Sequence, residues 1–277
     1  ESSEYPAMQL FAHFARRIRR DFSMKSEAVN VMRICRAVEG LPLAIELAAS
    51  WVRALSCESI AREIESSLAI LGTDLRDFPS RHRSMQAVFD QSWARLNEQE
   101  RDVLRRLSVF RGHFRRDAGE RIAGTNLALL SALVNKSILQ RSADDRYSIH
   151  PLLRQYAAEQ LAQDHAILAQ TRRAHSAYFT EFLWQCEADL TGGRQLAGLR
   201  AIAAEIDNIR TAWANLIETG DIQGISKASF AFSLFLDCQG RYAELIDSFI
   251  QAAQVHSEEE HAASLAYILV TLGWAYI

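Results

Sequence analysis

The sequence contains few turn-forming residues, with 12 glycines and 4 prolines among 277 residues. This composition suits long helices better than a β-sandwich, whose many turns need both residue types. The four cysteines (Cys35, Cys57, Cys186 and Cys238) are far apart and form no CxxC pair, which disfavours a disulfide scaffold or a zinc site. No apolar run approaches the roughly 18 residues of a membrane span, and no signal peptide is evident. We therefore expect a reduced, cytoplasmic protein without membrane contact.

The motifs of a self-contained enzyme are also lacking. The nearest match to a phosphate-binding loop, Gly119 to Thr125, has no lysine, and we predict a short helix that ends at Gly124. No HExxH motif, His/Cys cluster or GxSxG elbow occurs. The carboxylates of Glu205 and Asp207 are predicted to lie on a solvated helix face. Within this chain we predict no catalytic residue and no metal ligand.

Apolar residues recur at helical spacing along most of the chain, which predicts a mainly α fold. Residues 1–73 are predicted to form a helical domain, in which Gly40 ends one helix and Pro42 begins the next. Residues 73–83 lack this periodicity and are predicted to be a linker. The chain begins at Glu1 and stops inside an apolar helical pattern, so we expect a piece of a longer protein.

Residues 84–163 are predicted to form a winged-helix domain. Three short helices are expected at about 85–95, 98–108 and 126–135, and Asn97 to Glu100 has the spacing of a capping box. The only persuasive β signal is a hairpin, with strands at 137–141 and 146–150. Pro151 is predicted to begin the helix that follows.

Residues 166–277 are predicted to form an antiparallel array of helical hairpins. Apolar residues of its second helix recur at alternating three- and four-residue steps (Leu199, Ile202, Ile206, Ile209, Trp213 and Leu216). The segment from Leu269 to Tyr276 matches the start of a tetratricopeptide repeat, with leucine in the place of tryptophan. A generic helical pair remains an equal alternative to a truncated tetratricopeptide-like region.

Charge is divided unevenly along the chain. Residues 180–277 carry 5 Lys or Arg against 13 Asp or Glu, whereas residues 76–116 contain ten arginines and five acidic residues. The predicted recognition helix of the winged helix, 126–135, has no Arg or Lys to contact phosphates or guanine edges. This composition argues against direct DNA binding by that helix.

Several segments in order carry a family resemblance. Glu39-Gly-Leu-Pro-Leu-Ala-Ile-Glu-Leu-Ala48 resembles the GLPLA segment of NB-ARC or STAND signal-transduction ATPases, particularly their bacterial transcriptional-regulator branch. Arg146-Tyr-Ser-Ile-His-Pro-Leu-Leu-Arg-Gln-Tyr-Ala157 resembles the end of the family's winged-helix domain, and 204–213 resembles the helical region after it. The resemblance covers nearly the whole chain.

The resemblance implies a nucleotide site shared with an N-terminal P-loop domain, which would hold ADP or ATP with Mg²⁺. Pro42 corresponds to the proline that lies against adenine and ribose, and His150 to the MHD-motif histidine that approaches the β-phosphate of ADP. Pro151 departs from the acidic third residue of that motif. Because the phosphate loop would lie in the other domain, this chain alone is not expected to bind nucleotide tightly.

The resemblance thus implies a regulatory fragment of a slow ATPase switch in transcriptional regulation. Its domains would close over ADP, and ATP would release them, so that the protein oligomerises or frees an output domain. The C-terminal helical array would receive a protein or small-ligand inducer. Two alternatives are a winged-helix DNA-binding protein and a helical scaffold without nucleotide control.

Overall fold

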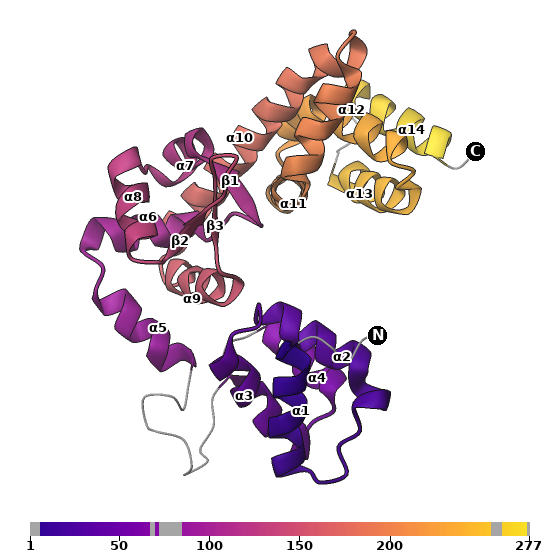
Figure 1. Cartoon of the computed structure of the whole chain (residues 1–277). Coiled ribbons are helices and arrows are strands. Elements are labelled where there is room, and N and C mark those ends of the chain that lie inside the picture. Colours follow the sequence, from indigo (N-terminus) through magenta and orange to yellow (C-terminus); the bar gives the residue numbers. More distant parts are fainter. Residues whose placement is uncertain (1–5, 67–69, 72–84, 256–261, 276–277) are drawn as a thin grey trace. The chain divides into compact units, whose positions relative to one another are not determined.

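The computed structural model describes residues 6–66, 70–71, 85–255 and 262–275. It is mainly α-helical with one small antiparallel sheet, as predicted (Figure 1). The predicted linker at 73–83 lies outside the described residues. The chain divides into two compact units, each assembled from several stretches of sequence. These units do not coincide with the three predicted domain ranges, which stay a prediction.

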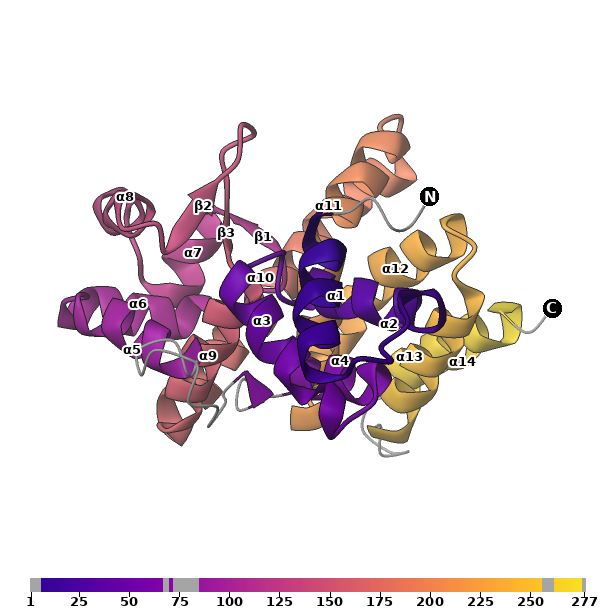
Figure 2. The same cartoon turned by 60° about the horizontal axis from the view of Figure 1, so that its bottom comes forward.

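The first unit contains residues up to 108, together with 128–140 and 149–163. Its first helices form one bundle, visible in both views (Figures 1 and 2). They are α1 (Pro6–Ile18), α2 (Met24–Ala37), α3 (Pro42–Ser50) and α4 (Cys57–Ser66), with a 3-10 turn at Trp51–Arg53. The pairs α1 with α3 and α2 with α4 pack together. Phe11, Val31, Ile34, Ile45 and Ile60 are fully buried between them, so the predicted apolar stripes form this core.

The remaining helices of the first unit are α5 (Met85–Ala94), α6 (Glu98–Leu107), α8 (Leu127–Asn135) and α9 (Pro151–Ala162). The predicted capping box at the start of α6 is confirmed. Asn97 Oδ1 accepts from the Glu100 N–H (2.9 Å), and a Glu100 carboxylate oxygen accepts from the Asn97 N–H (2.8 Å). Lys136 also contacts the Glu100 carboxylate at 2.6 Å, which together with the cap lowers the pKa of Glu100.

The sheet has three strands, one more than predicted. Strands β2 (Leu139–Arg141) and β3 (Arg146–Ile149) form the expected hairpin, and β1 (His113–Arg115) adds to the other edge of β3 in the order β1-β3-β2. In the antiparallel β1-β3 pair, Phe114 lies opposite Tyr147. Helix α7 (Arg116–Ala123) follows β1 and ends at Gly124 with a φ of 66°, which confirms the helix predicted in place of a phosphate loop.

The second unit contains residues 109–127, 141–148 and everything from 164 onward. Its helices after α7 are α10 (His165–Thr191), α11 (Gln195–Thr219), α12 (Ile222–Cys238), α13 (Tyr242–Val255) and α14 (Ala262–Ala275). Short turns join most of them, so successive helices fold back on one another (Figure 1). Trp213 of α11 stacks on Phe249 of α13 at 5.2 Å, within a core that also holds Phe232. Tyr276 of the tetratricopeptide pattern lies outside the described residues.

Candidate functional site

The turn between α2 and α3 carries the segment Glu39 to Pro42. Glu39 and Gly40 both have left-handed backbone, with φ of 46° and 71°. The Gly40 N–H donates to the Cys35 carbonyl (2.9 Å), which closes the end of α2. Glycine adopts this conformation freely, but a glutamate does so at some cost in free energy. The conformation of Glu39 is therefore imposed by its surroundings.

Pro42 is the first residue of α3, as the sequence predicts. The following Ala44 and Ile45 are fully buried and fix the start of this helix in the core. Pro42 itself is exposed. Its ring therefore offers a rigid apolar surface, without an N–H donor, beside the left-handed turn.

His150 ends the β2-β3 hairpin and caps helix α9. Its Nδ1 accepts a hydrogen bond from the Leu152 N–H (3.2 Å), and its carbonyl accepts from the Arg154 N–H (2.8 Å). Pro151 occupies the first turn of α9, where a missing N–H costs nothing. Because Nδ1 is an acceptor, the proton of the neutral ring is on Nε2.

The Nε2 atom of His150 points toward the turn that leads into Pro42. It lies 3.5 Å from a carboxylate oxygen of Glu39, and both residues belong to the first unit. Burial lowers the pKa of His150, while the Glu39 carboxylate and the Val38 carbonyl act in the opposite direction. No described residue completes a well-formed hydrogen bond to Nε2, although this atom is shielded from water. The lowered pKa leaves the ring neutral, and its Nε2 N–H faces the Val38 carbonyl and the Glu39 carboxylate without a well-formed hydrogen bond.

The structure thus places the two predicted site residues on adjoining segments, Pro42 after the turn and His150 against it. Sequence reasoning missed the role of Glu39, whose side chain is about half exposed and is the acidic neighbour of His150. No local signal could have revealed this contact, because it joins residues more than a hundred positions apart. Chemically, the arrangement offers an N–H donor and an apolar ring to a ligand with an acceptor group and a flat apolar part.

A second polar cluster lies within the second unit and is built around a buried ion pair. Arg146 of β3 and Glu205 of α11 form an ion pair at 2.6 Å, with side chains 9% and 7% exposed. Asn208 accepts from the Arg111 N–H (2.7 Å) and donates to the Glu205 carboxylate (3.1 Å). The prediction that Glu205 lies on a solvated face is wrong, because its face of α11 packs against the sheet. Asp207, two residues later, is largely exposed as predicted.

Metal chemistry gains no support from the side chains that the structure describes, since no three of their His, Cys, Asp or Glu residues gather at metal-binding range. The described helices also include none with the length and apolar character needed to cross a membrane. Cys35, Cys57 and Cys186 are buried thiols whose pKa values are raised by burial, so they are poor nucleophiles.

Comparison with known proteins finds no matching family model. The chain is 33% identical over 229 residues to a Mycobacterium tuberculosis protein provisionally named an HTH-type transcriptional regulator, and a Mycobacterium bovis protein of the same description matches equally. These alignments cover 78% of this chain and 25% of each relative. An uncharacterized M. tuberculosis protein is 31% identical over 182 residues, which is 60% of this chain and 46% of that protein. The chain therefore spans about a quarter of the length of the regulators it matches.

Proposed function

We propose that this chain is the regulatory part of a nucleotide-switched transcriptional regulator. In this proposal Pro42 and His150 contact ADP or ATP held by a P-loop domain in the same protein. The observation that carries it is the unused Nε2 donor of His150 beside the turn that leads to Pro42. The names of the mycobacterial relatives support a role in regulation, and the resemblance to STAND ATPases suggests the nucleotide.

The chemistry of the two residues suits this ligand. The His150 N–H would donate to a β-phosphate oxygen, and the Pro42 ring would lie against the base. Because a carboxylate repels phosphate, Glu39 would turn away when nucleotide binds, and its half-exposed side chain has room to do so. ADP and ATP would then favour different arrangements of the chain only insofar as they contact His150 differently. The ATP-favoured arrangement would oligomerise or release an output domain.

The decisive experiment measures ADP and ATP affinities of the protein that includes the P-loop domain. His150→Asn removes the Nε2 donor and keeps a side chain that caps helices well. A charge-assisted hydrogen bond to phosphate contributes about 1.5–3 kcal/mol, so we expect ADP affinity to fall about ten- to a hundredfold relative to ATP affinity. Pro42→Ala should weaken both nucleotides alike, since the base is common to both. An unchanged ADP-to-ATP ratio in His150→Asn contradicts the proposal.

The chain by itself provides the matching control. Most phosphate contacts are proposed to belong to the P-loop domain, so isothermal titration of residues 1–277 with ADP should give no dissociation constant tighter than about 1 μM, roughly −8 kcal/mol. Micromolar or tighter binding contradicts this division of contacts. In the same scheme the helices α10–α14 receive a protein or small-ligand inducer, and the protein acts in the cytoplasm.

Direct DNA binding is the second candidate, because the relatives' names mention an HTH. The helix in the position of a recognition helix, α8, exposes Leu127 and contains no Arg or Lys. Such a surface cannot neutralise phosphates or read guanine. We therefore propose that any DNA-binding part of the regulator is a different domain. Gel-shift titration of residues 1–277 at low salt should show no complex; a complex whose affinity drops when Arg115 and Arg116 are replaced by alanine would overturn this assignment.

A further inference from the structure

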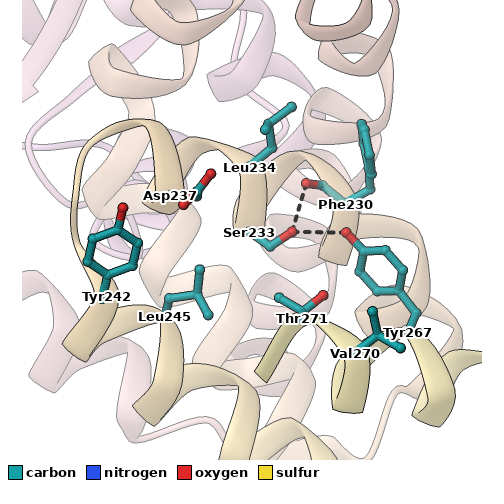
Figure 3. Close-up of a pocket in the computed structure, with 9 residues that line it drawn as sticks. All are labelled: Phe230, Ser233, Leu234, Asp237, Tyr242, Leu245, Tyr267, Val270 and Thr271. Carbon is teal, nitrogen blue, oxygen red and sulfur yellow. Dashed lines mark hydrogen bonds between the residues drawn. The ribbon is translucent and has the colours of Figure 1, made fainter. Parts of the chain in front are cut away.

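The C-terminal helices border an open surface pocket that the nucleotide proposal does not use, and its lining residues Asp237, Tyr242 and Val270 are exposed. It has a volume of about 440 Å³ and lies among α12, α13 and α14 (Figure 3). This size is within the range of small-molecule sites in proteins. Apolar side chains from three helices form part of its wall, among them Leu234, Leu245 and Val270. The polar groups that line it determine what it can recognise.

One polar pair in the wall is already satisfied. The Ser233 hydroxyl donates to the Phe230 carbonyl (3.0 Å) and lies 3.0 Å from the Tyr267 hydroxyl, so the two hydroxyls hold α12 and α14 together (Figure 3). In contrast, the Asp237 carboxylate and the Tyr242 and Thr271 hydroxyls have no side-chain partner among the described residues. These three groups line the pocket and are available to a ligand (Figure 3).

The charge at this pocket has one sign. Asp237 is the only ionised side chain among the described residues that line it. It also lies in the last turn of α12, where the helix dipole presents its negative end. Arg241 lies four residues later and contacts Glu244 at 3.0 Å, a carboxylate that Arg210 also contacts at 2.6 Å; it forms no ion pair with Asp237. Residues 180–277 as a whole carry 13 acidic against 5 basic residues, which further favours a cation.

We propose that this pocket binds a small organic amine. Its ammonium group would pair with Asp237 and its apolar part would lie between the tyrosine rings and Leu245, since aromatic faces attract cations and apolar groups alike. This inference stands independently of the nucleotide switch, and under the proposed function such an amine would be an inducer. The class of ligand follows from one unpaired carboxylate, three aromatic rings (Phe230, Tyr242 and Tyr267) and apolar walls around one cavity.

The test compares three probes of nearly equal shape: 2-phenylethylamine, 2-phenylethanol and 3-phenylpropionate. Each is titrated calorimetrically into residues 1–277 near pH 7, without nucleotide, so that the result is separate from the ATPase proposal. We expect the amine to bind with a dissociation constant near or below about 1 mM and the other two to bind at least about tenfold more weakly. Asp237→Asn should weaken the amine about tenfold or more and leave the alcohol unchanged.

A matched control uses Asp247 on α13, which is exposed and does not line the pocket. Asp247→Asn changes the net charge by the same amount, so it should leave amine binding within twofold of the native value. Thermal melting of both variants establishes that they remain folded. The proposal is overturned by equal binding of amine and alcohol, by equal losses in the two variants, or by no amine binding up to about 10 mM.

Discussion

His150 and His175 lie in different units and share one feature, an Nε2 atom that is shielded from water and has no hydrogen bond from the described residues. Their surroundings differ. His175 is 1% exposed and packs between Phe110 and Phe179, with ring centres 5.6 Å and 4.7 Å away. His150 has a side chain 18% exposed, beside the half-exposed Glu39. The same orphan atom thus belongs to a core side chain in one unit and to a partly exposed side chain in the other.

The different exposure of the two histidines decides whether an N–H without a hydrogen bond can serve a ligand. Burial lowers the pKa of both histidines, because a low-dielectric environment disfavours the charged ring. A ligand would reach the Nε2 of His150 by displacing the half-exposed Glu39 side chain, whereas reaching that of His175 would open a packed core. An orphan imidazole N–H is therefore evidence for a binding site where access exists, and is a cost in stability where it does not. The following predictions test the buried region around His175 and the partly exposed His150.

The largest loss of unfolding free energy is expected from a substitution in the buried polar cluster beside His175. Glu205 pairs with Arg146 beside the His175 core, and Glu205→Ala leaves the guanidinium buried without its partner. Removing one member of a buried ion pair costs about 3–5 kcal/mol of unfolding free energy. Urea denaturation followed by circular dichroism measures this loss. Asp207→Ala is the matched control: its side chain is 64% exposed and pairs with Arg210 at the surface, so we expect a loss under about 1 kcal/mol.

The Arg146→Met, Glu205→Leu double variant distinguishes an ion pair from simple loss of packing. With both charges removed, stability should return to within about 1–2 kcal/mol of the native value, because apolar pairs often replace buried ion pairs without loss. A double variant as unstable as Glu205→Ala would mean that the surrounding hydrogen bonds, and not the ion pair, hold the sheet to α11.

The next effect is a pH dependence from His175. Burial lowers the pKa of this histidine from 6.5 to about 3. Below about pH 6.5, His175 is protonated in the unfolded chain but stays neutral in the folded core. The unfolding free energy therefore falls as the pH falls below about 6.5. Between pH 6 and pH 5, this one group should reduce the unfolding free energy by about 1.2 kcal/mol. Urea titrations at several pH values give the unfolding free energy as a function of pH. Its slope should be smaller by that amount in His175→Gln than in the native protein, and equal slopes would mean that other groups cause the acid sensitivity.

Local signals in the sequence predicted much of the fold. The capping box at Asn97 and the start of α3 at Pro42 depend on residues within one turn, so spacing was sufficient to find them. Strand β1 was missed because it has three residues with one buried side chain, Phe114, and exists through its pairing with β3. Glu205 was misplaced because its partner is 59 positions earlier. Long-range contacts of this kind leave no periodic trace.

The candidate site was predicted only in part, and for the same reason. Pro42 and His150 came from motif resemblance, and their nucleotide contacts stay a prediction. Neither the carboxylate of Glu39 beside His150 nor the pocket at Asp237 has a signature in the sequence, since each is assembled from segments that meet only in the folded chain.

The smallest expected change in stability comes from His150, which should contribute little to the unfolding free energy beyond its cap on α9. His150→Ala removes the acceptor for the Leu152 N–H and should cost about 1 kcal/mol, the usual value of a lost N-cap. His150→Asn restores an acceptor and should be within about 0.5 kcal/mol of the native protein. Melting curves of the two variants measure the difference. If His150→Asn instead destabilises the chain by 3 kcal/mol or more, roughly the range of a disrupted core, then the imidazole is a packing residue like His175, and the contrast between the two histidines fails.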